Sequence, residues 1–312
     1  MRITLNMQNG QTLLDLNNDQ QQIDQISQSI SSGVQFSSPA DDPYGWAESM
    51  NIQQSSREYT TIQSNISFAT GWQDATSSAL NQLSDLISQA QQLAVSAVSS
   101  TGSSNGAELA TEVNSILQQA LTVANTQYNN QYIFSGTMTG TAAISFDSST
   151  GTTTPNGNSG TAGEINVRTG TNSGSSGNLT TINLTSQDAF FYTSGGNTTD
   201  VFHEIWNLGQ EITAGNTTGI SNSETALQDA FDHINNESTI VGSSLSELST
   251  QKSAISSIQT NTQSELSNLQ DTDVTTATTQ LTQAQAAYEA ALDVTDKLDS
   301  LNLASILTGS TS

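Results

Sequence analysis

The chain has 312 residues, and its five Lys or Arg residues against 29 Asp or Glu residues give it a formal net charge of −24 at pH 7. Nucleic acids and anionic membranes bind clustered basic groups, so we expect neither as a partner. The chain has no cysteine, which excludes disulfides, thiolate metal sites and thiol nucleophiles. The N-terminal sequence lacks the apolar core of a cleaved signal peptide, and no apolar run is long enough to span a membrane.

Apolar residues are sparse. Leu, Ile, Val and Phe together make up roughly a fifth of the chain, close to the level at which a stable core becomes hard to build. Charged residues are also scarce, at 11%, and the remainder is dominated by Ser, Thr, Asn and Gln. This composition favours an elongated molecule of thin helical bundles over a compact enzyme.

The first predicted element is an amphipathic helix over residues 5–30. One face of this helix carries apolar residues at helical spacing, namely Leu16, Ile23, Ile26 and Ile30. The helix is expected to end at Ser31-Ser32-Gly33, because glycine readily adopts the left-handed C-cap conformation. Residues 34–46 contain two prolines and a glycine and are predicted to form a loop. In this loop the Asp41 and Asp42 side chains can accept hydrogen bonds from nearby backbone amides.

Further helices are predicted over residues 47–99 and 108–128, and Gly71 is a candidate break in the first. The composition then changes at Thr137 to Gly, Ser, Thr and Asn, which favours a small β domain with short strands. Its candidate strands cover residues 142–146, 164–168, 179–184 and 189–193. Helical periodicity resumes at 201–212 and again over 224–269.

The last predicted helix contains a heptad repeat. Small or apolar residues alternate at spacings of three and four, with Thr295 filling one gap, at Val274, Ala277, Leu281, Ala284, Tyr288, Ala291 and Leu298. Such spacing is typical of a seam that packs against another helix. Asp273 is well placed to cap the start of this helix. Because both chain ends carry a seam, we expect them to pair with each other or with the same regions of neighbouring molecules.

The predicted fold is mainly α with a β insert: an elongated antiparallel helical bundle or coiled coil from both chain ends, plus a small β domain in the middle. Residues 1–50 and 271–312 are predicted to form a terminal paired-helix assembly domain. Residues 51–138 and 197–270 form a helical rod domain, and 139–196 form the insert, rich in Gly, Ser and Thr. An ordinary two-helix hairpin inside one globular core is the alternative for the two ends.

The residues with catalytic or metal-binding side chains show no arrangement typical of an active site. The two histidines, His203 and His233, each lack a second histidine at metal-ligand spacing. Asp41 and Asp42 are adjacent carboxylates in a loop flanked by prolines, where capping and turn roles are commoner than catalysis or cation binding. We therefore expect no enzymatic activity, cofactor or metal.

Three stretches resemble the flagellin superfamily. Ser31-Ser32-Gly33 with Ser38-Pro39-Ala40-Asp41-Asp42-Pro43 is similar to its N-terminal motif, and the Asp-Asp-Pro form resembles the branch of type 3 hook-associated proteins. Asn130-Gln131-Tyr132-Ile133-Phe134-Ser135-Gly136 resembles the signature that ends the family's first helical half. The heptad after Asp271-Thr272-Asp273 resembles its C-terminal domain. The chain departs from the family at Gln35-Phe36, where a basic and an aliphatic residue are usual, and at the bulkier Tyr44-Gly45-Trp46.

The resemblance implies a structural subunit of the bacterial flagellum, secreted by type III export and joining hook to filament. It implies an assembly interface on the two seams and a motif loop that includes Ser32, Gly33, Asp41, Asp42 and Pro43. The implied partners are the first hook-associated protein, flagellin, further copies in a ring and an export chaperone. The alternatives are a filament-forming flagellin, or a flagellin-like surface adhesin or enzyme with activity in the insert.

Overall fold

The computed structural model describes residues 5–99, 105–156, 163–171, 179–194 and 196–309. The chain forms two compact units. The first combines residues 1–57 with 259–312, and the second comprises residues 58–258. The predicted boundaries near residues 50 and 271 therefore fall inside the first unit, and the predicted insert lies within the second.

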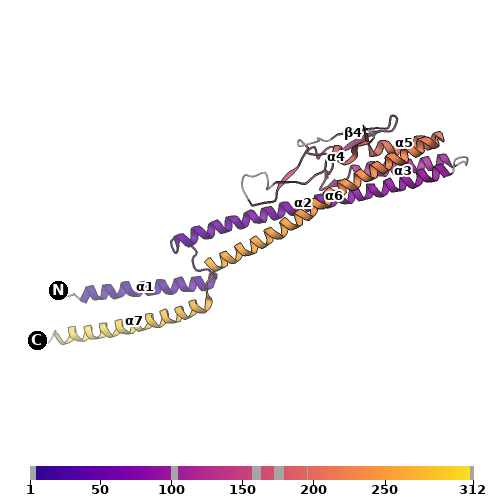
Figure 1. The fold of residues 1–312 in the computed structure, drawn as a ribbon. Coiled ribbons are helices and arrows are strands. Elements are labelled where there is room, and N and C mark those ends of the chain that lie inside the picture. The colour runs from indigo at the N-terminus through magenta and orange to yellow at the C-terminus, as the bar shows by residue number, and fades with distance from the viewer. Residues whose placement is uncertain (1–4, 100–104, 157–162, 172–178, 195, 310–312) are drawn as a thin grey trace. The chain divides into compact units, whose positions relative to one another are not determined.

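The first unit contains a pair of helices from the two chain ends. Helix α1 (Leu5–Ser32) and helix α7 (Val274–Gly309) lie side by side (Figure 1). They run antiparallel. Asp19, midway along α1, lines one groove with Ala287 of α7. Val34, two residues after α1, forms a β-bridge with Asp271, three residues before α7. This pairing confirms the prediction that the two chain ends form an antiparallel helical pair.

Two long helices form the backbone of the second unit. Helix α2 (Pro43–Ser99) and helix α6 (Thr217–Gln270) run antiparallel there, since Gln91 donates to Gln228 at 3.2 Å and Ser238 donates to Asn81 at 3.5 Å. Gly71 does not interrupt α2. A Cβ atom at Gly71 would overlap the phenol of Tyr128, so glycine lets this ring pack directly against the helix.

Two shorter helices complete the helical part. Helix α3 (Gly106–Ala124) packs closely on helix α5 (Val201–Ala214), and a Cβ on Gly209 would lie 3.5 Å from the Val113 side chain. Helix α5 starts at the N-cap Asp200, whose carboxylate accepts the Phe202 and His203 amides at 3.0 Å. It ends at Gly215, which has φ of 66° in the left-handed region.

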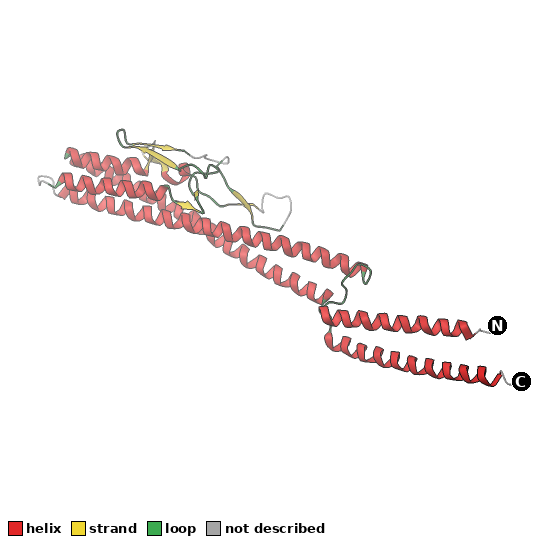
Figure 2. Cartoon of the chain, turned by 180° about the vertical axis from the view of Figure 1, so that it is seen from behind, coloured by secondary structure: helices red, strands yellow, loops and turns green. Residues whose placement is uncertain are grey.

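In the part of the chain that the structure describes, the strands pair as four separate antiparallel ladders of two strands each. Figure 2 shows strands in yellow beside the helices. In chain order the ladders pair β1 (Gln127–Tyr128) with β2 (Gln131–Tyr132), β3 (Ile144–Asp147) with β4 (Thr152–Pro155), β5 (Asn166–Arg168) with β6 (Leu179–Thr181), and β7 (Phe191–Ser194) with β8 (Asn197–Asp200). A short helix, α4 (Ser186–Phe190), precedes β7. No ladder in the described residues grows beyond two strands, so the region does not form a β-sheet with its own core.

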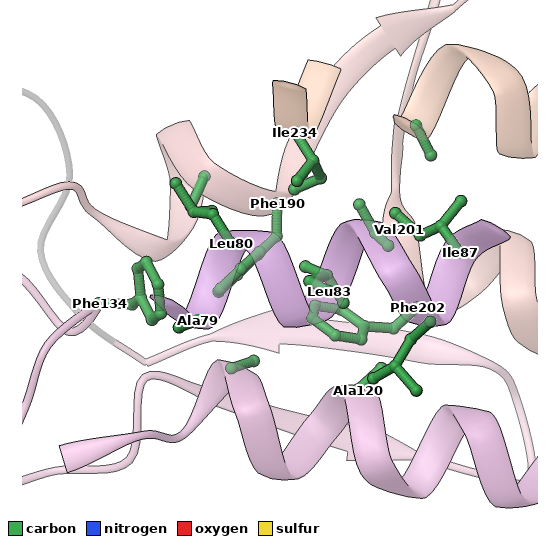
Figure 3. Close-up of a cluster of buried hydrophobic side chains, with 14 of the residues drawn as sticks. Ala79, Leu80, Leu83, Ile87, Ala120, Phe134, Phe190, Val201, Phe202 and Ile234 are labelled. Atoms are coloured by element: carbon green, nitrogen blue, oxygen red, sulfur yellow. The ribbon is translucent and has the colours of Figure 1, made fainter. Parts of the chain in front are cut away.

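The predicted insert instead contributes to the core of the helices. Phe190 from α4 lies 4.9 Å from Phe134 and 5.2 Å from Phe202, measured between ring centroids, and Figure 3 shows these rings beside Leu80 and Leu83 of α2. Ile144 and Ile182 belong to the same buried cluster. An independent domain would bury its apolar residues within itself. The apolar residues of the insert and of the helices therefore belong to one buried cluster, and the small β hairpins of the predicted insert pack on it.

The structure corrects several predicted boundaries. The helix expected to reach residue 128 ends at Ala124, because Asn129 and Asn130 adopt positive φ values of 49° and 62° and form the two-residue turn between β1 and β2. Helix α2 starts at Pro43 and α6 at Thr217, both earlier than expected. Strands β4 and β8 were not predicted, and part of the expected 189–193 strand is α4.

Candidate assembly site

The two predicted seams face each other across the α1/α7 pair. The α1 seam residues Leu16, Ile23, Ile26 and Ile30 are half-buried. On α7, Ala277 is buried, and the later seam positions are half-buried, namely Leu281, Ala284, Tyr288, Ala291 and Thr295. Leu298 lies on α7 but outside the residues whose side chains are described. A pair of helices alone therefore leaves the seam only partly covered.

Val274 does not join the seam. Its side chain is 52% exposed, and the covered part of the stripe starts at Ala277. The heptad rhythm includes Val274, but its side chain is more open to solvent than the seam positions that follow it.

Further apolar side chains point away from the seam. Leu13 and Leu14 on α1 are 61% and 60% exposed, and Leu292 and Val294 on α7 are 41% and 54% exposed. The sequence analysis did not select them because they fall outside the three-four rhythm. Large exposed apolar side chains on two neighbouring helices are a feature of surfaces that become covered by a partner.

Glutamine side chains line the grooves beside the seam. A groove of about 520 Å³ is bordered by Gln22, Gln25, Gln280 and Gln283, among others. Gln25 also borders a second groove of about 620 Å³ between α1 and the loop that follows it. These amides offer both donors and acceptors, so the edges of the helix pair are polar but carry little charge.

The motif loop uses its carboxylates as backbone caps. The Asp41 carboxylate accepts the amides of Ser37 and Ser38 at 3.0 and 2.9 Å, and these hydrogen bonds lower the pKa of Asp41. Asp42 accepts the amides of Tyr44 and Gly45 at 3.1 and 3.0 Å, which makes it the N-cap of α2. Pro43 occupies the first helical position, where its missing N–H costs nothing. Both aspartates therefore support local structure.

The bulky residues of the loop are accommodated by Gly45. Phe36 is only 5% exposed, and a Cβ on Gly45 would lie 2.9 Å from its ring and overlap the Asp42 carboxylate. Glycine at this position lets the Phe36 ring and the Asp42 cap occupy the same small space. Tyr44, next to it, is 79% exposed.

The two linkers beside α1 and α7 are hydrogen-bonded to each other. Gly33 ends α1 with φ of 76°, and its carbonyl accepts the Thr272 amide at 2.9 Å. The Gln35 amide donates to the Gln270 carbonyl at 2.7 Å, and the Gln35 side-chain amide donates to the Asp271 carbonyl at 2.9 Å. Sequence reasoning missed this contact, although it noted Gln35 as a departure from the family pattern.

Asp273 caps α7 as predicted. Its carboxylate accepts the Thr275 and Thr276 amides at 2.9 and 3.3 Å and the Thr276 hydroxyl at 2.8 Å. The Thr276 hydrogen bonds are the main reason that the pKa of Asp273 is lowered. The cap is therefore strongest when Asp273 is ionised.

The two histidines have structural partners. His203 Nδ1 donates to the Gly151 carbonyl at 2.8 Å, and His233 Nε2 donates to the Asp188 carbonyl at 3.0 Å while its ring stacks on Tyr192. Within the described part of the chain, no group of three or more His, Asp or Glu side chains is arranged to hold a metal ion. Nor does any helix described there have the length and apolarity needed to cross a membrane.

Comparison with known proteins identifies the two helical ends. The N-terminal helical region of bacterial flagellin matches residues 3–139, and the C-terminal helical region of bacterial flagellin matches residues 225–307. Together the two regions account for more than half of the chain. The chain belongs to the flagellin family. This confirms the resemblance seen in the sequence motifs.

Solved structures share the fold of this flagellin-family chain. A putative flagellar hook-associated protein of Vibrio parahaemolyticus is 20% identical, with a TM-score of 0.62 over 74% of this chain and 100% of that one. FlgL of Bacillus cereus is 19% identical, with a TM-score of 0.56 over 69% and 98%. A flagellar hook-associated protein 3 of Legionella pneumophila is 14% identical, with a TM-score of 0.61 over 70% and 98%. No curated protein sequence matches the chain.

Proposed function

We propose that this flagellin-family chain is a structural subunit of the bacterial flagellum that joins the hook to the filament. The observation that carries the proposal is the likeness in fold to several hook-associated proteins, one of which is described as the flagellar junction protein of Legionella pneumophila. The Asp-Asp-Pro sequence at residues 41–43, which caps α2, supports the same branch of the family.

The terminal helix pair supports an assembly role. Its seam is half-buried, and Leu13, Leu14 and Val294 are exposed on its outer faces. Isolated helix pairs with so little apolar contact gain little stability, whereas neighbouring copies would cover both the seam and the outer residues. In this proposal the pair packs among equivalent helices of other subunits.

The proposed partners follow from this placement. The first hook-associated protein contacts the chain on the hook side, flagellin contacts it on the filament side, further copies complete the ring, and an export chaperone binds it before secretion. The protein acts outside the cell, as part of the flagellum. Its role is mechanical rather than enzymatic, since the Asp41 and Asp42 carboxylates are engaged by backbone amides.

Deleting the gene tests the proposal. A cell without a junction subunit still makes and exports flagellin, so we expect flagellin in the culture supernatant, hooks without filaments and no motility. The control is the deleted strain carrying the intact gene on a plasmid. The second candidate is a filament-forming flagellin, which the description of the matched family regions favours. If the deleted strain lacks its main filament protein and releases no other flagellin into the supernatant, the junction role is wrong.

A further inference from the structure

The seam of the terminal helix pair does not by itself define one register. Its apolar positions repeat every seven residues on both helices, as at Ile23 and Ile30 on α1 and at Leu281 and Tyr288 on α7. A slip of one heptad, about 10 Å along the helix, again places apolar residues opposite apolar residues. The flanking glutamines do not oppose such a slip, because each amide can act as donor or acceptor toward whichever polar group it then faces.

The two helices are tethered very differently. Only residues 271–273 separate α6 from α7, so α7 is held closely to the end of α6. Residues 33–42 separate α1 from α2, and a chain of this length can span more than 30 Å when extended, roughly three times a one-heptad slip. Helix α1 is therefore the member of the pair that is free to slide.

We propose that the pairing of residues 33–35 with residues 270–272, here called the linker latch, sets the register of the terminal helix pair. The latch ties the long linker of α1 to the short linker of α7 through three hydrogen bonds of 2.7–2.9 Å. Two are between main-chain atoms, and the third is donated by the Gln35 side chain. Gln35 is thus the positioning residue, because it contributes both a main-chain and a side-chain donor.

The left-handed conformation at Gly33 makes the latch possible. With φ of 76° at Gly33, the chain turns out of α1 and presents the Gly33 carbonyl to the Thr272 amide. The latch lies entirely within the first compact unit and concerns the isolated chain. It therefore holds whether or not the protein is a junction subunit, and its test needs no assembled flagellum.

Cysteine cross-linking in the purified full chain measures the register directly, because the native chain has no cysteine. Gln22 and Gln283 border one groove in the observed register, so Gln22→Cys with Gln283→Cys reports this register. Gln22→Cys with Ala290→Cys, one heptad further along α7, reports a slip. Mild oxidation at low protein concentration, with non-reducing gels to separate monomer from dimer, gives the ratio of the two intramolecular cross-links.

In the native background we expect the Gln22–Gln283 pair to cross-link in large excess. Gln35→Ala and Gln35→Glu both remove the side-chain donor and should lower the ratio about fivefold, the effect of one ordinary hydrogen bond. Gln35→Arg keeps a donor and should preserve the ratio. Gln28→Ala is the matched control, because Gln28 donates to Ser37 at 3.5 Å and not to the other linker.

Two outcomes would overturn the proposal. If Gln35→Ala and Gln35→Glu keep the native ratio, Gln35 does not position the helix pair and the proposal is wrong. If the native chain already forms both cross-links equally, no register is fixed before assembly.

Discussion

At the scale of single residues, the polar side chains of the terminal unit mainly complete backbone hydrogen bonding. Asp41, Asp42 and Asp273 all accept amides at loop and helix starts. The role of Asp273 was predictable because an aspartate directly before an apolar repeat is a common helix start. The role of Gln35 was not, since a contact between residues 35 and 271 depends on how two distant linkers meet.

The Asp273 cap should make the start of α7 sensitive to acid. The folded chain lowers the pKa of Asp273 below its ordinary value of 3.8, so its stabilising effect is present above this pH and is lost as the pH falls through the lowered pKa. Asp273→Asn still caps but does not titrate. We expect the Thr275 and Thr276 amide resonances of the native chain to shift in this acid range more than those of the variant. Equal shifts in both proteins would rule out the cap as their source.

Tyr288 tests the seam. Tyr288→Glu places a carboxylate on a half-buried stripe that further helices would bury completely, at a cost on the order of several kcal/mol in the assembled state. We expect the variant to be secreted normally but to be absent from isolated hooks, with flagellin in the supernatant. Gln285→Glu, at an exposed position three residues earlier, is the control and should assemble. Normal filaments with Tyr288→Glu would show that Tyr288 does not face a buried seam.

At the scale of elements, the helices were predictable and the ladders largely were not. Heptad spacing defined α1, most of α2 and α7 because one face of each helix is consistently apolar. Strands β4 and β8 are mostly Thr and Asn and have no apolar alternation. Their positions depend on tertiary contacts, such as the hydrogen bond of 2.6 Å from the Thr153 hydroxyl to the Asp200 carboxylate. Composition alone also could not show that Phe190 packs against helices.

The shared core predicts which insert residue matters most. Phe190→Ala removes a fully buried ring between Phe134 and Phe202, and substitutions of this kind cost about 3–5 kcal/mol. Leu179→Ala, at a position in the same region that is 52% exposed, should change stability by less than about 0.5 kcal/mol. The stabilities of the two variants are compared by urea denaturation, monitored through the circular dichroism signal of the helices. If Phe190→Ala leaves the urea midpoint of the helical signal unchanged, the insert is stable independently of the helices.

At the scale of the whole molecule, charge repulsion is the dominant long-range interaction. Five basic residues stand against 29 acidic ones, which leaves a net charge of −24. An attractive pair such as Arg168 with Glu58, at 3.8 Å, has both side chains substantially exposed. Exposed ion pairs of this kind contribute little to the stability of the folded chain, and added salt weakens them. Over the chain as a whole, repulsion therefore outweighs attraction.

Added salt should raise the thermal stability of the chain. The Debye length falls from about 30 Å at 0.01 M to about 8 Å at 0.15 M salt, so repulsion between distant carboxylates is largely screened. We expect the melting temperature at pH 7 to rise by a few degrees over this range, measured by calorimetry. Sodium chloride and potassium chloride should act alike, since the effect is one of ionic strength. A fall in melting temperature would mean that attractive pairs dominate.

The first unit is built from two segments that are far apart in the chain, and this determines the order in which the chain can fold. This unit takes its residues from both chain ends, 1–57 and 259–312, whereas residues 58–258 are contiguous. Bringing the ends together in an otherwise unfolded chain closes a very long loop, which slows folding. If residues 58–258 fold first, the two chain ends are no longer joined by a long unfolded loop, because they continue from the folded helices α2 and α6. Helix α1 precedes residues 58–258 in the chain and α7 follows them, so α1 waits through the synthesis of the whole second unit before its partner helix exists.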